Sequence, residues 1–235
     1  MGRQAKGKLN AAGITTVKQL SDTDSAVLQG LKVNEKFKLH AKAHTDNKEI
    51  VIKKPELPKT KTEIFFDVES ETQLNIDYLY GLLIREGKKE KYTAYWADSI
   101  EEEKKIWKDF CSFMSKQDDF TVYYYTSYEL QSLKRLKVKY GMDEKLYKKI
   151  LDNAIDLYSV LTKNIILPVY SYSIKSVARY LGFDWESEKA SGSQSMVWYT
   201  EYIKAKNKKI KDTIIQYNKD DCVATRVLKD WLVKL

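Results

Sequence analysis

The stretch "EIFFDVES", residues 63–70, is a run of apolar β-strand formers that ends in two carboxylates, Asp67 and Glu69. Alternate residues of a strand point to the same face, so these two acids lie on one side of the strand and their charges repel each other. Two acids at the end of a buried strand therefore need a positive partner. The stretch predicts a central strand with a candidate cation site at its end.

The elements that follow this stretch predict an α/β domain. Runs of β-branched and aromatic residues predict four strands, at about 62–68, 77–86, 91–97 and 120–126. Helices are expected at 99–116 and from 127 to 140. Three consecutive strands, a helix, a fourth strand and then mostly helices match the order of a ribonuclease H-like fold, in which helices flank a mixed sheet.

The positive charge of the chain is concentrated in its first quarter. The 235 residues carry a net charge of +8, and residues 1–61 contain 13 Lys and Arg against 6 Asp and Glu. Residues 62–235 are nearly neutral, with 28 Lys and Arg against 27 Asp and Glu. A basic segment attached to a neutral domain is typical of polyanion binding, and the alternative is a solvated lysine-rich face.

Residues 1–48 are expected to form a small basic module of the helix-hairpin-helix type. Glycines separate its short predicted helices, and Thr15 or Thr16 is the expected N-cap of one of them. Such a module would hold nucleic acid through backbone amides and lysines, with little base preference. The alternative is a helical remnant of a longer chain. Residues 49–61 are rich in proline and lysine and predict a linker to a main domain at 62–235.

Other features of the sequence indicate a cytoplasmic protein without membrane association. The first ten residues are polar and basic, unlike a signal peptide, and no apolar run approaches the ~20 residues of a membrane helix. Cys111 and Cys222 form no close pair, so reduced thiols are expected. His40 and His44 have no nearby cysteine and make a poor zinc site.

Two further acids occupy positions from which they could join Asp67 and Glu69. Glu129 follows the predicted strand 120–126 at the start of a helix, and Asp221 lies in an amphipathic C-terminal helix. Tyr217 precedes Asp221 by four residues and so shares its helix face. The neighbouring Asp220 would point about a quarter-turn away and is the less favoured ligand, although the sequence leaves both open.

Four acids from two strand ends and two helices could converge on two divalent ions. Carboxylate oxygens suit Mg²⁺ or Mn²⁺, and a pair of ions ~3.5 to 4 Å apart can promote phosphodiester hydrolysis. The ions would also neutralise the repulsion between Asp67 and Glu69. Metal-dependent cleavage of nucleic acid is therefore the leading interpretation of this set of acids.

The ordered motifs also resemble a known family. The stretches "FFDVES", "YYYTSYE", "LPVYSYSIKSVARYLGF" and "YNKDDCVATRVLKDWL" make residues 62–235 similar to the tyrosine-type DEDD superfamily of 3′ to 5′ exonucleases. Within the ribonuclease H-like group, the chain resembles most the YprB-like domain of RecB-family nucleases. The resemblance implies 3′ to 5′ exonuclease activity with two Mg²⁺ or Mn²⁺ ions.

The resemblance assigns roles to individual residues. Asp67 and Glu69 match the first motif, Glu129 the second, and Asp221 with Tyr217 the third. In this interpretation the four acids are the metal ligands, with Asp67 bridging both ions, and Tyr217 orients the attacking water. Glu129 stands where most of the superfamily carries Asp. Relatives of this kind often occur beside helicase or Cas4-like nuclease domains, so such a domain of the same longer chain is an expected partner.

Several other residues have a functional and a structural interpretation. Lys175 and Arg179, four apart on a predicted helix, are candidate nucleic-acid contacts or part of a solvated face. Asp156 is expected to cap a helix. The aromatic clusters 123–125 and 198–202 could stack bases of a single strand, but core packing is favoured for most of them.

The resulting expectation is a nuclease that acts on DNA, at a single-stranded 3′ end. An endonuclease would use the same acids, and an inactive nucleic-acid-binding module is a further alternative. A ribonuclease also stays open, because no base-reading motif is present and 2′-OH recognition has no short sequence signature.

Overall fold

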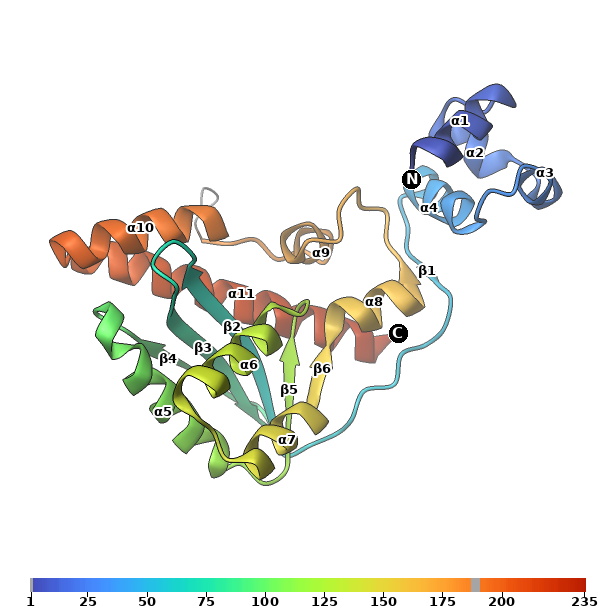
Figure 1. The fold of residues 1–235 in the computed structure, drawn as a ribbon. Coiled ribbons are helices and arrows are strands. Elements are labelled where there is room, and N and C mark those ends of the chain that lie inside the picture. The colour runs from blue at the N-terminus through green and yellow to red at the C-terminus, as the bar shows by residue number, and fades with distance from the viewer. Residues whose placement is uncertain (1, 187–190) are drawn as a thin grey trace.

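The computed structural model describes residues 2–186 and 191–235, and it opens with four short helices (Figure 1). Thr16 is the N-cap of the second helix and forms a capping box with Gln19, which confirms the predicted cap. The helices enclose a small apolar core around Leu9, Leu20 and Leu28. Their bounds are α1 (Arg3–Ala11), α2 (Val17–Asp22), α3 (Ser25–Gly30) and α4 (Lys36–Asp46).

The segment around the end of α4 makes noncovalent contacts with residues 165–170, much later in the chain. β1 (Ile50–Val51) pairs antiparallel with β7 (Ile165–Ile166). Just before it, the ring of His44 stacks on that of Tyr170, with the centroids 4.5 Å apart. Composition predicts only a linker over 49–61, because a two-residue strand whose partner lies far later in the chain leaves no local signal.

Five strands form one mixed sheet, with the strand that carries the two acids at its centre. Its order is β4-β3-β2-β5-β6; β2 pairs antiparallel with β3 and parallel with β5. The four strands predicted from the sequence are confirmed to within a few residues, and so is the mixed sheet. The bounds are β2 (Thr62–Glu71), β3 (Ile76–Glu86), β4 (Lys89–Trp96), β5 (Phe120–Tyr124) and β6 (Ala154–Asp156).

Helices cover both faces of this sheet (Figure 1). α5 and α6 pack on one face, and the 27-residue α11 crosses the other face against β2 and β3. Within the described ranges, no helix combines the length and the apolarity needed to cross a membrane. The helices are η1 (Ile100–Glu102), α5 (Glu103–Ser115), α6 (Tyr128–Tyr140), α7 (Glu144–Asp152), α8 (Leu157–Asn164), α9 (Ile174–Tyr180), α10 (Gly192–Ala205) and α11 (Lys208–Lys234).

Alternation along β2 decides which face receives the acids. Phe66 stacks on Phe110 of α5, with the ring centroids 5.4 Å apart, and belongs to the larger core cluster. Phe65 belongs to a second cluster with Leu228 of α11. Asp67 is two residues after Phe65, so it points toward α11. Glu69, two residues further on, points the same way. The apolar residues of β2 thus orient its acids.

The aromatic clusters lie mainly in the core, as favoured from the sequence. Tyr123 and Tyr199 are fully buried, and Tyr125 and Tyr202 are nearly so. Tyr199 stacks on Tyr78 of β3 with the ring centroids 3.8 Å apart. These side chains stabilise the sheet and are not free to stack on bases.

The packing of α11 on the sheet predicts a position-dependent loss of stability. Leu228 is fully buried, whereas Val233 on the same helix is 49% exposed. Leu228→Ala should lower the free energy of unfolding by about 2 to 5 kcal/mol, because it leaves a cavity under the helix. Val233→Ala should change it by less than about 0.5 kcal/mol. Urea denaturation followed by circular dichroism measures both, and equal effects would contradict the placement of α11.

Candidate active site

Asp67 and Glu69 lie in the C-terminal half of β2, on the face that α11 covers. In the register with β3, Asp67 is opposite Gly81 and Glu69 is opposite Leu79. The register shifts directly after Glu69, so regular pairing is interrupted beyond the second acid. Glu69 is only 5% exposed, and Asp67 keeps somewhat more contact with solvent. The shared face predicted from alternation is therefore present.

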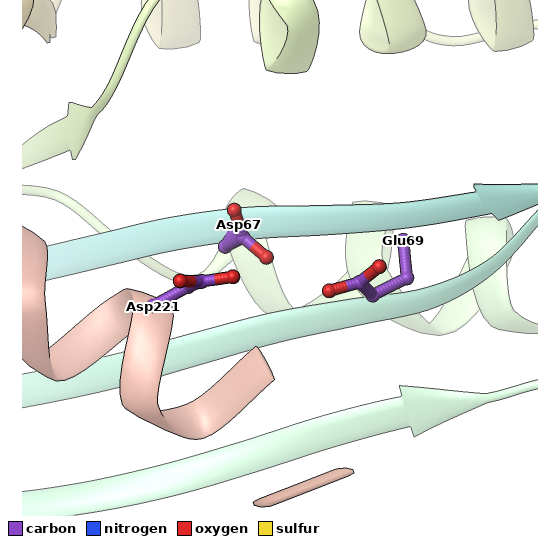
Figure 2. A group of neighbouring side chains, drawn as sticks. All are labelled: Asp67, Glu69 and Asp221. Atoms are coloured by element: carbon purple, nitrogen blue, oxygen red, sulfur yellow. The ribbon is translucent and has the colours of Figure 1, made fainter. Parts of the chain in front are cut away.

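α11 contributes the third acid of the group. One oxygen from each of Asp67, Glu69 and Asp221 lies within 4.8 Å of the others. Figure 2 shows the three carboxylates close together, from β2 and α11. Asp220 is directed elsewhere and accepts a hydrogen bond from the backbone N–H of Glu186 at 3.0 Å. The geometry thus favours Asp221 over Asp220 as a ligand, in agreement with the helix-face argument.

Glu129 lies in the first turn of α6, and its charge interacts with those of Asp221 and Glu69. Its side chain is buried, and among the residues that the structure describes its Oε2 has no hydrogen-bond partner. Burial, followed by the charges of Asp156, Asp221 and Glu69, raises the pKa of Glu129 to about 8. Glu129 is therefore a buried carboxylate with one oxygen that lacks a partner among the described residues, and it is not one of the three acids whose oxygens lie within 4.8 Å of one another.

Each carboxylate of the group of three accepts a hydrogen bond from an uncharged donor. Such donors hold a carboxylate in place without neutralising it, so the negative charge remains available to a cation. The pairs are Asn218 Nδ2 with Asp67 Oδ2 (2.6 Å), Trp185 Nε1 with Asp221 Oδ1 (2.8 Å) and Ser195 Oγ with Glu69 Oε2.

The acids raise one another's pKa. Burial first, and then the charges of Asp221 and Glu69, place the pKa of Asp67 well above its ordinary value. Burial, with the charge of Asp221, raises the pKa of Glu69 to about 8, and burial raises that of Asp221 to about 7. Without a cation, the group therefore holds protons at neutral pH. A bound divalent ion would allow all of its members to ionise.

Tyr217 and Lys175 adjoin the acids. Tyr217 lies one turn before Asp221 on α11, and its hydroxyl lowers the pKa of the Asp221 carboxylate. Burial, and then the charge of Asp221, raises the pKa of Tyr217, so the phenol keeps its proton and can act as a donor. Lys175 Nζ of α9 lies 5.0 Å from the ring centroid of Tyr217, and its charge lowers the pKa of Asp221 and Glu69. The structure thus brings both predicted residues to the acids.

Arg179 and Asp156 have structural partners. Arg179 is about half exposed, and its Nε lies 3.1 Å from the carboxylate of Asp184. Asp156 is the N-cap of α8 and accepts a hydrogen bond from the backbone N–H of Tyr158 at 2.9 Å, which confirms its predicted cap. Its charge also contributes to the raised pKa of Glu129. The exposure of Arg179 is compatible with a nucleic-acid contact, which stays a prediction.

The three hydrogen-bond donors were not predicted from the sequence. Asn218 precedes Asp221 by three residues, so the helix spacing that identified Tyr217 could also have identified it. Trp185 lies just after α9 and Ser195 at the start of α10. Neither lies in one of the motifs that contain the four candidate acids, and only tertiary packing brings them to the carboxylates.

The acid group fits hard divalent ions. Three carboxylate oxygens lie close enough to share one cation, and hard oxygen ligands are those that Mg²⁺ and Mn²⁺ prefer. The buried Oε2 of Glu129 offers a further oxygen without a partner among the described residues. No histidine or cysteine belongs to this group as described, so its chemistry does not favour zinc.

Comparison with known proteins finds a family match over the part of the chain that contains the acids. The family model RNase_H_2, described as RNase_H superfamily, matches residues 64–233, which include all four acids. The chain belongs to the RNase H superfamily. This membership and the mixed five-stranded sheet confirm the predicted ribonuclease H-like α/β fold. A search among curated proteins finds no match. Placement of this RNase H superfamily member in the tyrosine-type DEDD branch remains a prediction.

The raised pKa values predict how stability depends on pH in the metal-free protein. Glu69 and Glu129 have ordinary values of 4.5 and folded-state values of about 8. Between these values the folded state binds more protons than the unfolded chain, so the free energy of unfolding falls as pH rises. Their stabilising contribution is complete below pH 4.5 and is lost as pH rises through 8. In EDTA, the Tm should therefore fall across this range, and Mn²⁺ should raise it most near pH 8.

Thermal unfolding from pH 5 to 9, with EDTA or Mn²⁺, measures this dependence. Glu69→Gln should flatten the decline, whereas Glu201→Gln, at an exposed position on α10, should retain it. An unchanged slope in Glu69→Gln would contradict the electrostatic description of the site.

Proposed function

We propose that this protein is a two-metal-ion-dependent nuclease that hydrolyses phosphodiester bonds of DNA as a 3′ to 5′ exonuclease. The observation that carries this proposal is the convergence of Asp67, Glu69 and Asp221 on one small volume. A module that only bound nucleic acid would gain nothing from buried carboxylates facing an anionic backbone. Membership of the RNase H superfamily supports a nucleic acid as the substrate.

The acids would hold two Mg²⁺ or Mn²⁺ ions. Asp67 has neighbours on both sides, Glu69 on its own strand and Asp221 on α11, so it is the proposed shared ligand. Glu129 would contribute from α6 the oxygen that has no partner in the part of the chain that the structure describes. When bound, the ions would activate a water molecule and neutralise the charge that develops on the phosphate. The hydrogen-bond donors Asn218, Trp185 and Ser195 would keep the carboxylates in place during the reaction.

Tyr217 and Lys175 would act on the substrate side of the acids. Tyr217 keeps its proton, so its hydroxyl would orient the attacking water as a hydrogen-bond partner and would not remove a proton from it. Lys175 carries a positive charge beside the acids and would contact a phosphate of the bound strand. Arg179, further along α9, would contribute a second phosphate contact.

The 3′ to 5′ direction of cleavage and the choice of DNA as substrate are proposed from the motifs. The D-x-E motif on β2 and the Y-x-x-x-D motif on α11 are those of the tyrosine-type DEDD exonucleases, which the chain resembles. A single-stranded 3′ end of DNA is the proposed substrate. The basic helices α1 to α4 would hold nucleic acid outside the site, because most of the excess positive charge lies in residues 1–61. A helicase or Cas4-like nuclease domain of the same longer chain is the proposed partner.

The decisive assay compares DNA and RNA labelled at the 3′ or the 5′ end, with Mn²⁺, Mg²⁺ or EDTA. We expect stepwise loss of 3′ nucleotides from single-stranded DNA only when metal is present. Asp67→Asn and Asp221→Asn should lower the rate by more than about 100-fold, because each removes a charged ligand. Asp220→Asn is the matched control on the same helix and should retain most of the activity.

The other outcomes separate the alternatives. Cleavage of circular DNA would indicate an endonuclease, and preferential loss of RNA would indicate a ribonuclease with the same acids. Nucleic-acid binding that is equal with and without metal, with no product under any condition, would overturn the proposal in favour of a binding module.

A separate prediction concerns the phenol of Tyr217. Tyr217→Phe keeps the ring and removes the hydroxyl, so the turnover rate should fall by about 10 to 100-fold while Mn²⁺ affinity stays close to that of the wild type. Single-turnover cleavage and calorimetric titration with Mn²⁺ measure the two quantities. An equal loss of both would show that the hydroxyl acts only through Asp221, and an unchanged rate would remove Tyr217 from the mechanism.

A further inference from the structure

Asn218 is a fully buried amide between α11 and the sheet. Its Nδ2 donates to Asp67 Oδ2 at 2.6 Å and lies 3.4 Å from the backbone oxygen of the same residue. Its Oδ1 accepts a hydrogen bond from the hydroxyl of Tyr92, on β4, at 2.7 Å. The amide thus connects α11 to both β2 and β4.

Gly81 leaves the space that this amide occupies. It lies on β3 opposite Asp67, and a Cβ atom there would be 1.6 Å from Asn218 Oδ1 and 3.0 Å from the Tyr92 hydroxyl. The first distance is far inside van der Waals contact, and the backbone at Gly81 does not adopt a positive φ. Glycine is therefore required here for space and not for backbone conformation. α11 approaches the sheet directly beside Asp67.

Tyr92 decides which end of the amide faces Asp67. An amide has an accepting oxygen and a donating nitrogen, and a phenol whose pKa is raised by burial keeps its proton and donates to the oxygen. The nitrogen is then directed at the carboxylate. The opposite orientation would place a carbonyl oxygen against a carboxylate oxygen and would leave the phenol without its acceptor, so it is strongly disfavoured.

The donor is also uncharged. A lysine or arginine at this position would form an ion pair with Asp67 and would compete with a bound cation. An amide satisfies one carboxylate oxygen and leaves the charge of the group unchanged, which is the role of an outer hydrogen-bond partner in a metal site.

We infer that Asn218, oriented by Tyr92 in the space left by Gly81, is a positioning residue that holds the Asp67 carboxylate in the geometry needed for divalent-ion binding. The inference rests on the proposed metal-dependent function and assigns to Asn218 no contact with substrate.

Calorimetric titration of the full chain with Mn²⁺, in the absence of nucleic acid, tests the inference. Asn218→Ala should weaken Mn²⁺ binding by about 10 to 100-fold. Tyr92→Phe keeps the ring and lets the amide turn, so it should weaken binding in the same direction by a smaller factor. Gly81→Ala should resemble Asn218→Ala, because its methyl group would displace the amide.

Thr62→Val is the matched structural control. Thr62 is a buried side chain at the other end of β2, with a hydrogen bond to Glu86. Its replacement should lower the Tm and leave Mn²⁺ affinity unchanged. Raising the Mn²⁺ concentration should restore cleavage by Tyr92→Phe toward the wild-type rate, since the defect lies in metal binding.

The outcomes distinguish this inference from the proposed function. If the wild type binds Mn²⁺ and cleaves DNA, but Tyr92→Phe and any folded Asn218 variant bind Mn²⁺ as tightly as the wild type, Asn218 is only structural and the inference is wrong. If the wild type binds no Mn²⁺, both the inference and the proposed function are overturned.

Discussion

Repulsion between the carboxylates of Asp67, Glu69 and Asp221 is the constraint on which the rest of residues 62–235 depends. Oxygens of all three lie within 4.8 Å of one another, and burial removes much of the water that would screen their charges. The surrounding fold must hold them together against this repulsion. It does so by placing two acids on a central strand and the third on the longest helix, whose apolar side chains pack on the same sheet.

The same constraint explains the character of the neighbouring residues. The donors to the three acids are an amide, an indole and a hydroxyl, so they direct the carboxylates without cancelling their charge. Lys175 lowers the pKa of Asp221 and Glu69, yet that of Glu69 still lies at about 8. One lysine therefore does not offset the effects of burial and mutual repulsion on the pKa of Glu69. A bound divalent ion would supply more positive charge and would give a partner to the Glu129 oxygen that has none among the described residues.

Much of this arrangement could be predicted because its signals are local. The β-formers of "EIFFDVES" predict the strand, alternation predicts that its acids share a face, and helix spacing predicts that Tyr217 accompanies Asp221. The donors Trp185 and Ser195 could not be predicted, because their contacts depend on where a loop and a separate helix pack. Helix spacing could have predicted that Asn218 lies near Asp221. Its role, however, depends on Gly81 and Tyr92, which lie on strands far earlier in the chain. Local pattern identifies the candidate ligands, and only the assembled fold shows which side chains orient them.

Anomalous diffraction from crystals grown with Mn²⁺ would test the central claim most directly. We predict two manganese peaks at the acid group, one of them coordinated by oxygens of Asp67, Glu69 or Asp221, and the loss of both peaks in Asp67→Asn crystals. Absence of manganese from this group at saturating concentration, or peaks that persist unchanged in Asp67→Asn, would contradict this prediction.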